Sequence, residues 1–248
     1  MTDAGAYVYG TVRADHPVPT GLRGVGSPPG AVTTCTVGRL TAVISAAPLD
    51  LRARRRDLLA HQELLLRLAE DGPVLPMRFG MVAADESAVR RQLADAEDSH
   101  LAVLERLAGR VEMNVKVMPA NDALAALVRE DATVRALRDA VRRRPSYQAN
   151  MRLGEAVAGA LTRRATEAGR EVVSHLAASS HAVSAGPEVA GCVVNTSFLV
   201  DRCDSAGFRA EVERLAAHHR NRAELRVAGP LPCYSFLEAE VPAGSIGA

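Results

Sequence analysis

The sequence predicts an α+β protein with two small domains, each containing a modified ferredoxin-like sheet, and a long helical segment between them. Three observations support this fold class. Period-two strand patterns occur near both ends of the chain, helical periodicity separates them, and almost everything between residues 119 and 179 favours helix. A chain of 248 residues can bury two cores of this size. We place the domain boundary between residues 118 and 119, giving domains 1–118 and 119–248.

The first strands are predicted near the N-terminus. Ala6–Val12 is rich in Tyr and Val, and the Pro- and Gly-rich stretch 14–30 that follows is typical of a loop. Val32–Val37 and Leu40–Ile44 favour strands, and a two-residue Gly-Arg connection between them suits a type II′ turn. These two strands are therefore expected to form a hairpin.

Two amphipathic helices are predicted next. The first begins near Asp50 and is stopped by Asp71-Gly72-Pro73; the second runs from about Asp85 to Gly109, which suits a helix C-terminus. The apolar stripe expected to face the core in the first helix consists of Leu51, Leu58, Leu59, Gln62, Leu65, Leu66 and Ala69.

Two further extended segments belong to this half. Val74–Phe79 is short, and Pro76 would confine it to a sheet edge because proline has no amide hydrogen to donate. Val111–Val117 alternates strictly between apolar and polar residues, which predicts one buried and one solvated face. The solvated face would carry Glu112, Asn114 and Lys116.

The second half begins with helices and returns to strands. An Arg-Arg-Arg-Pro break precedes Ser146–Ser179, which reads as one long helix weakened by its glycines, with Tyr147, Met151, Val157, Leu161, Ala168, Val172 and Leu176 as its apolar positions. The C-terminal part predicts strands at Ala182–Ala185, Cys192–Val200, Ala223–Val227 and Cys233–Phe236, with a helix capped by Asp204 and facing inward at Phe208, Val212 and Leu215.

Composition excludes several classes of protein. The net charge of +1 and the small number of aromatic residues argue against a nucleic-acid binder. No apolar run reaches the ~18 residues that a membrane-spanning helix needs. The four cysteines are scattered, and no apolar segment follows a basic N-terminus, so we expect a reduced, cytoplasmic protein that does not bind membranes.

Motifs for catalysis and for cofactors are missing from the sequence. It contains no phosphate-binding glycine loop, no C-x-x-C pair and no nucleophile elbow, so we expect no cofactor and no metal. His61 is the best single candidate for a general base. A histidine at the edge of an apolar helix stripe more often serves as a structural hydrogen-bonding residue, so we expect a protein that is not an enzyme.

Several segments of the chain, taken together and in order, form a specific pattern. The most specific are the Pro-Met-Arg-Phe-Gly and Arg-Val-Glu-Met blocks, and the full set is 7–10, 61–62, 74–80, 109–116, 195–200 and 229–236. On these segments, which span nearly the whole chain, the sequence resembles the gas vesicle protein GvpF/GvpL family; it departs from the family pattern at Leu231 and Cys233.

The resemblance implies an accessory protein of the gas vesicle, of the F type on the basis of its compact length. It also implies a two-domain α+β fold with modified ferredoxin-like parts. Its partners would be the main shell protein GvpA and other gas vesicle proteins, and it would limit the aggregation of GvpA during vesicle nucleation. An edge strand of this chain could pair with the GvpA subunit, and the candidate strands are Val74–Phe79 and Val111–Val117. Arg78, Phe79, Glu112 and Lys116 are the predicted partner-binding residues.

Two alternatives make different structural predictions. A regulatory module that binds a small molecule would show a mostly apolar pocket with a few converging polar groups. An enzyme without a cofactor would show His61 within hydrogen-bond reach of a carboxylate in a cleft.

Overall fold

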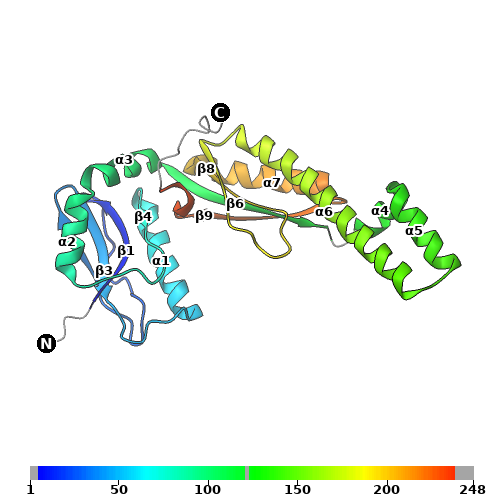
Figure 1. The fold of residues 1–248 in the computed structure, drawn as a ribbon. Helices are drawn as coiled ribbons and strands as arrows, with labels where there is room; N and C mark the ends of the chain where they lie inside the picture. Colours follow the sequence, from blue (N-terminus) through cyan, green and yellow to red (C-terminus); the bar gives the residue numbers. More distant parts are fainter. Residues whose placement is uncertain (1–4, 121–122, 238–248) are drawn as a thin grey trace, which may run out of the picture. The chain divides into compact units, whose positions relative to one another are not determined.

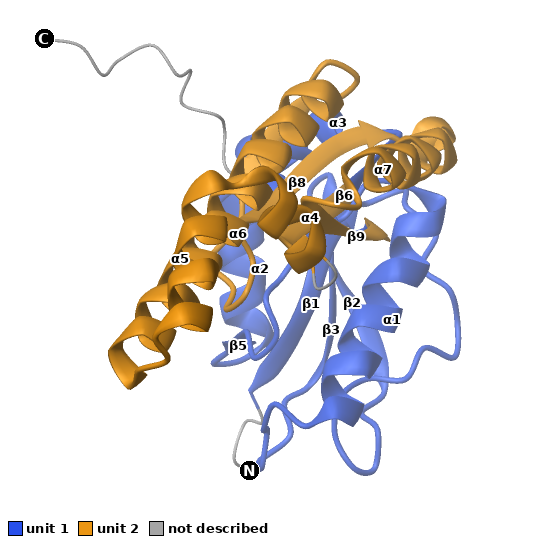
Figure 2. Ribbon diagram, turned by 90° about the vertical axis from the view of Figure 1, so that its right-hand side faces the viewer, with its two compact units in different colours: residues 1–112, 231–248 blue, residues 113–230 orange. Residues whose placement is uncertain are grey.

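The computed structural model describes residues 5–120 and 123–237 (Figure 1). Its packing divides the chain into two compact units (Figure 2). Unit 1 comprises Met1–Glu112 and Leu231–Ala248, and unit 2 comprises Met113–Pro230. Each unit holds one sheet with helices packed against it, so the α+β prediction is confirmed. Whether residues 1–118 and 119–248 fold as separate domains stays a prediction.

The sheet of unit 1 is antiparallel and has the order β2-β3-β1-β4, with β5 also paired to β1. The predicted hairpin forms, and Gly38 in its turn has a φ of 55° as a type II′ turn requires. Pro76 lies in a strand at the sheet edge, as predicted. The strands are β1 (Ala6–Arg13), β2 (Val32–Val37), β3 (Leu40–Ala46), β4 (Leu75–Pro76) and β5 (Val82–Ala83).

Three helices complete unit 1: α1 (Arg55–Asp71), α2 (Glu86–Asp95) and α3 (Glu97–Leu107). The single helix predicted from Asp85 onward is divided into α2 and α3 at Ala96, while the Asp85 carboxylate caps α2 by accepting from Ala88 N. Helix α1 packs on β1, and α2 packs across β2 and β3.

The buried face of α1 differs from the predicted stripe. Helix α1 begins five residues later than expected, and Leu58, Leu59 and Gln62 are exposed. Two polar side chains on the inward face have partners elsewhere in unit 1, which sets the rotation of the helix: Asp57 accepts from Gly26 N, and His61 bonds to Tyr7. The buried residues of α1 are Asp57, His61, Leu64, Leu65 and Leu68.

Unit 2 has a sheet of order β7-β8-β6-β9, the order of a ferredoxin-like βαββαβ unit, which confirms that part of the prediction. Its strands are β6 (Arg110–Pro119), β7 (Ala182–Ala185), β8 (Val194–Asp201) and β9 (Ala223–Leu231). Its helices are α4 (Leu124–Glu130), α5 (Ala132–Arg143), α6 (Tyr147–Ala177) and α7 (Ser205–His219). Helices α6 and α7 pack on β8, and α4 and α5 pack beside α6 (Figure 1).

The long helix α6 is confirmed, and Ser146 caps it by accepting a hydrogen bond from Ala149 N at 3.1 Å. Its C-terminal half is buried at Ala165, Ala168, Val172 and Leu176. Gly169 does more than weaken the helix: a Cβ there would lie 2.6 Å from Val194 Cγ2, so glycine allows α6 to approach β8. The predicted apolar positions Tyr147 and Met151 are instead exposed.

The predicted strand at Ala223–Val227 forms and extends to Leu231. Two other predictions for the C-terminal region are wrong, the final strand and the cap of the last helix. Tyr234–Phe236 forms a 3₁₀ turn in place of the strand predicted at Cys233–Phe236. Asp204 precedes α7, but its side chain makes no capping hydrogen bond because a 3₁₀ turn, Arg202–Asp204, leads directly into the helix.

Candidate partner-binding site

Side chains from distant parts of unit 1 meet around His61. The Tyr7 hydroxyl lies 2.9 Å from His61 Nδ1, and His61 Nε2 lies 2.9 Å from the carbonyl oxygen of Met77. A carbonyl can only accept, so Nε2 carries the ring proton and Nδ1 accepts from Tyr7. The Tyr234 hydroxyl lies 3.4 Å from the same Nε2. None of these three partners of His61 is a carboxylate, so the arrangement predicted for an enzyme is not found around this ring.

Aromatic rings surround this hydrogen-bond network. Tyr9 stacks on His61 with ring centroids 5.6 Å apart, and Phe79 meets both Tyr7 and His61 edge to face. The Tyr9 hydroxyl accepts from Val25 N at 2.8 Å and bonds to Ser45 Oγ at 3.0 Å. Three of the four tyrosines in the chain thus lie in one hydrophobic core with His61 beside them. Such rings are held rigidly because their polar atoms have partners.

The network fixes a short turn at the edge of the sheet. Residues 77–83, which we call the edge segment, follow β4 and include β5. Met77 N donates to Tyr9 O at 2.8 Å, and Val8 N donates to Met81 O at 3.0 Å, so both sides of the turn are attached to β1. Within it, Met81 N donates to Arg78 O, and Gly80 adopts a φ of 90° at the position where a type II turn favours glycine. Gly80 N also donates to the Tyr7 hydroxyl at 3.3 Å.

The side chains of the edge segment point in different directions. Phe79 is half-buried against the aromatic rings, while Arg78 is exposed and has no ion-pair partner among the described residues. Met81 and Val82 are 50% and 46% exposed, which is high for apolar side chains attached to a sheet. The segment therefore offers two apolar side chains and one cation on a rigid backbone.

Glu112 lies on the face of β6 that was predicted to be solvated, but it is buried. Its carboxylate accepts from Ser235 N at 2.9 Å and from Ser235 Oγ at 2.8 Å, so the Tyr234–Phe236 turn covers it. The expectation of a wet face fails here because a segment distant in sequence packs over it. Lys116 is half-buried on β6 within unit 2, whereas Arg78, Phe79 and Glu112 belong to unit 1. Partner contact by any of the four stays a prediction.

Burial controls the protonation of the cluster. Desolvation lowers the pKa of His61, although its hydrogen bond to the Met77 carbonyl acts in the opposite direction. Desolvation also raises the pKa of Tyr7, and it raises the pKa of Tyr234 to about 12. His61 and the tyrosines are therefore neutral at pH 7, and the site has no charged group at its centre.

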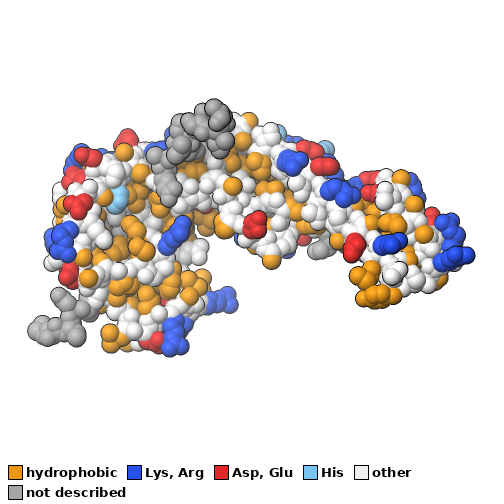
Figure 3. All heavy atoms as spheres, in the orientation of Figure 1, with side chains coloured by type: hydrophobic (Ala, Val, Ile, Leu, Met, Phe, Trp, Pro, Cys, Tyr) orange, Lys and Arg blue, Asp and Glu red, His pale blue; other side chains and the backbone are white. Residues whose placement is uncertain are grey.

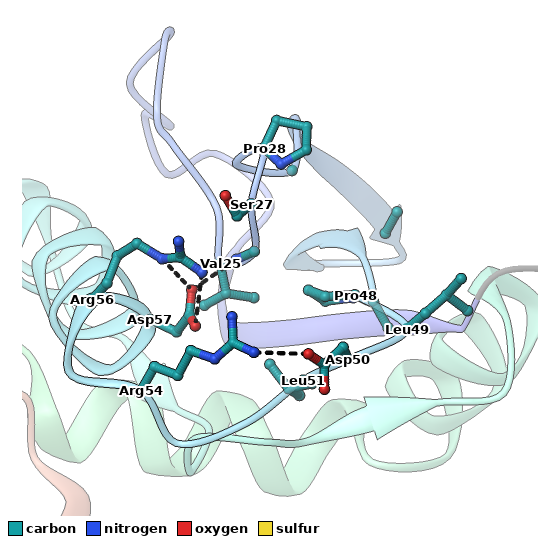
Figure 4. A pocket seen from close by; sticks show the side chains of 14 residues that line it. Val25, Ser27, Pro28, Pro48, Leu49, Asp50, Leu51, Arg54, Arg56 and Asp57 are labelled. Atoms are coloured by element: carbon teal, nitrogen blue, oxygen red, sulfur yellow. Dashed lines mark hydrogen bonds and ion pairs between the residues drawn. The ribbon is translucent and has the colours of Figure 1, made fainter.

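A groove of about 430 Å³ lies elsewhere in unit 1, between the loop at Val25–Gly30 and the start of α1 (Figure 4). Arg54 pairs with Asp50 at 2.7 Å, and Arg56 pairs with Asp57 at 3.3 Å. Gly26 N donates to the same Asp57 carboxylate, and this bond is the main reason why the pKa of Asp57 is lowered. The charged side chains of this groove are therefore paired with one another. A small-molecule site would instead be expected to have unpaired polar groups that converge on the ligand.

Metal clusters and membrane-spanning helices are both missing from the part of the chain that the structure describes. Within residues 5–120 and 123–237, no group of three or more His, Cys, Asp or Glu side chains could hold a metal ion. Over the same residues, no helix is long and apolar enough to cross a membrane.

The sequence predicted partner contact at Arg78 and Phe79, which stays a prediction, but it did not reveal the residues that position them. Tyr7 and Tyr9 lie two residues apart on one strand, which places both rings on the same face. That spacing, together with the scarcity of aromatic residues, was the available signal for an aromatic cluster. The sequence did not indicate that Met81 and Val82 are exposed, because two apolar residues after a glycine turn are typical of an ordinary strand.

Comparisons with known proteins show what the whole chain is similar to. Residues 5–238 match the family model described as gas vesicle synthesis protein GvpL/GvpF. The chain is 40% identical to gas vesicle protein F of Streptomyces sp. (strain CB03234), covering 94% of this chain and 99% of that protein. Gas vesicle protein L of the same strain is 31% identical, covering 95% and 93%.

Solved structures show the same fold. The crystal structure of GvpF from Anabaena sp. PCC7120 matches with a TM-score of 0.75 at 23% identity, covering 96% of this chain and 100% of that one. GvpF from Microcystis aeruginosa matches with a TM-score of 0.71 at 22% identity, covering 95% and 100%.

Proposed function

The chain belongs to the GvpL/GvpF family of gas vesicle synthesis proteins and takes part in gas vesicle formation, and from this premise we propose that it binds the main shell protein, GvpA. In this proposal the chain keeps GvpA from aggregating while a vesicle nucleates, as a chaperone-like assembly factor that transforms no substrate. Other gas vesicle proteins are expected among its partners, as the family implies.

The wall of the gas vesicle explains why such an assembly factor would be needed. A subunit that builds a water-repelling wall exposes apolar patches and unpaired strand edges before it is incorporated. A binding partner with a matching edge can cover both by backbone pairing and apolar contact.

The main support for the proposal is the position of the edge segment on the outer side of the sheet of unit 1. Among the described strands, β4 and β5 each pair only with β1, so they form the outer side of this sheet. Met81 and Val82 supply apolar contact there, and the exposed Arg78 supplies a charge that selects the orientation of the partner. Because the Tyr7–His61 network already fixes the turn, little conformational entropy is lost on binding.

The second candidate strand is less suited to edge pairing. Strand β6 lies between β8 and β9, so both of its sides are already paired. We therefore propose that Arg78 and Phe79 lie at or next to the contact and that Glu112 acts indirectly by holding the Tyr234–Phe236 turn. A contribution of Lys116 would be a separate contact in unit 2.

A co-sedimentation assay tests the proposal. Purified GvpA is mixed with increasing amounts of the full-length chain, and the fraction of GvpA that remains in the supernatant is measured. We expect the wild-type chain to raise this fraction and the double variant Met81→Glu, Val82→Glu to lose most of the effect, because two carboxylates would have to be buried in an apolar contact.

Leu49→Glu is the matched control. Leu49 is a fully exposed apolar residue in the same unit but outside the edge segment, so this variant should behave like the wild-type chain. Circular dichroism confirms that each variant is folded. Equal GvpA sedimentation with and without the wild-type chain would eliminate the proposal, and equal activity of the double variant would eliminate this surface.

A further inference from the structure

The junction of α5 and α6 in unit 2 carries an exposed group of arginine and apolar side chains. Tyr147, the one tyrosine outside the buried cluster of unit 1, is 79% exposed, and Met151 is 48% exposed. They are four residues apart on α6 and therefore share one face of the helix. Figure 3 shows hydrophobic side chains gathered here beside Lys and Arg side chains. We call Arg142, Arg143, Arg144, Tyr147, Met151 and Arg152 the basic tip.

The basic tip carries an excess of positive charge. Between Leu124 and Arg152 the chain has seven arginines and three acidic residues. Glu130 pairs with Arg164 and Asp131 caps α5, while Asp139 pairs with Arg138 and also interacts electrostatically with Arg142 and Arg143. Within the described chain, the four arginines of the basic tip have no ion-pair partner, and a surface of this kind attracts carboxylates.

The backbone beneath the tip is well anchored. Ser146 caps the first turn of α6 through Ala149 N, and its carbonyl accepts from Asn150 Nδ2 at 3.1 Å. Leu127, Val134 and Ala160 form a small core between α4, α5 and α6, with Leu153 and Val157 packed against it. The exposed side chains therefore project from a preformed support, which reduces the entropy lost on binding.

The residue types of the basic tip indicate the kind of partner that it would bind. Tyr and Arg dominate the energetic centres of protein–protein interfaces, and Met is enriched there. A single aromatic ring gives no row of stacking positions for nucleic-acid bases. We propose that the basic tip is a docking surface for an acidic amphipathic helix of a partner protein, whose apolar face would cover Tyr147 and Met151 while flanking carboxylates pair with the arginines. This surface is independent of the proposed GvpA contact in unit 1.

Fluorescence anisotropy with the full-length chain tests this inference. The probe is a labelled amphipathic peptide of about 18 residues with leucines on one face and glutamates beside them. The comparison probe has lysine in place of glutamate. We expect the glutamate probe to bind, added salt to weaken it, and Arg143→Glu or Tyr147→Ala to weaken it by roughly tenfold or more. Both side chains are exposed, so neither change should disturb folding.

Arg163→Glu is the control, because Arg163 is an exposed arginine of α6 outside the tip and the change in charge is the same. It should bind the glutamate probe like the wild-type chain. Phosphatidylglycerol vesicles and a single-stranded RNA oligonucleotide serve as alternative anionic probes. The inference is overturned if the two peptides bind equally, if neither binds, if the tip variants match the control, or if only vesicles or RNA bind.

Discussion

The Tyr7 hydroxyl bonds to His61 Nδ1 at 2.9 Å across 54 residues of sequence, and this bond joins β1 to α1. The same hydroxyl accepts from Gly80 N, and the other ring nitrogen of His61 donates to Met77 O. One continuous set of hydrogen bonds therefore fixes the edge segment to the interior of unit 1. Buried residues can in this way determine the positions of Arg78, Met81 and Val82.

Replacing Tyr7 with phenylalanine should destabilise the protein. The change removes the donor for His61 Nδ1 and the acceptor for Gly80 N, and His61 is buried, so a loss of about 1–3 kcal/mol in the free energy of unfolding is expected. Urea denaturation measures it. Tyr234→Phe is the matched control and should cost less, since the Tyr234 hydroxyl lies 3.4 Å from His61. A larger effect in the control would contradict the assigned network.

Stability should fall as the pH is lowered from 7 to 5. Burial lowers the pKa of His61, and also those of His16, His100 and His219, so in this range the unfolded chain binds more protons than the folded one. The loss begins near the ordinary histidine pKa of about 6.5 and ends below the folded-state values. His61→Gln should reduce the slope of unfolding free energy against pH, measured by denaturation at several pH values. An unchanged slope would show that His61 is not held neutral.

Two glycines of α6 should respond to alanine with opposite signs. Gly154 is exposed with open space around its Cα, so Gly154→Ala should stabilise the helix by about 0.5–1 kcal/mol. Gly169 faces Val194, and Gly169→Ala should destabilise the protein by about 1–3 kcal/mol because the new methyl group overpacks the contact with β8. Thermal unfolding of both variants is the measurement. The same sign for both would refute the close approach of α6 and β8.

Gly80→Ala should cost about 1–2 kcal/mol, although a Cβ there would meet no neighbouring atom. The cost comes from the φ of 90°, which a residue with a side chain rarely adopts. Arg78→Ala, two residues earlier, should change the unfolding free energy by no more than about 0.5 kcal/mol, because Arg78 is exposed. Chemical denaturation of the two variants separates backbone strain from loss of a side chain. Equal stability of Gly80→Ala and wild type would rule out the strained turn.

Periodicity predicted where several elements lie, although not every face that they bury. The hairpin of β2 and β3, strand β6 and the capped helix α6 could all be found in this way, because turn residues, alternation and a capping serine act over a few residues. The C-terminal Tyr234–Phe236 segment was mistaken for a strand because a short apolar-aromatic run does not reveal a 3₁₀ turn.

The candidate site depends on contacts that no local pattern contains. Glu112 was expected to face water, yet its partner Ser235 is 123 residues away. The inward face of α1 is likewise selected by Gly26 and Tyr7, which bond to Asp57 and His61. Buried polar side chains must find partners, and tertiary packing chooses those partners. A count of apolar residues along the helix could not anticipate either one.

The return of residues 231–237 to unit 1 has a consequence for biosynthesis. A ribosome releases the chain from its N-terminus, so the sheet and α1 emerge long before Tyr234 and Ser235. Until then the Glu112 carboxylate lacks its two hydrogen bonds from Ser235. Translation of unit 1 therefore begins before that of unit 2 and is completed after it, and a premature stop codon shortly before Leu231 would leave unit 1 without the Tyr234–Phe236 turn.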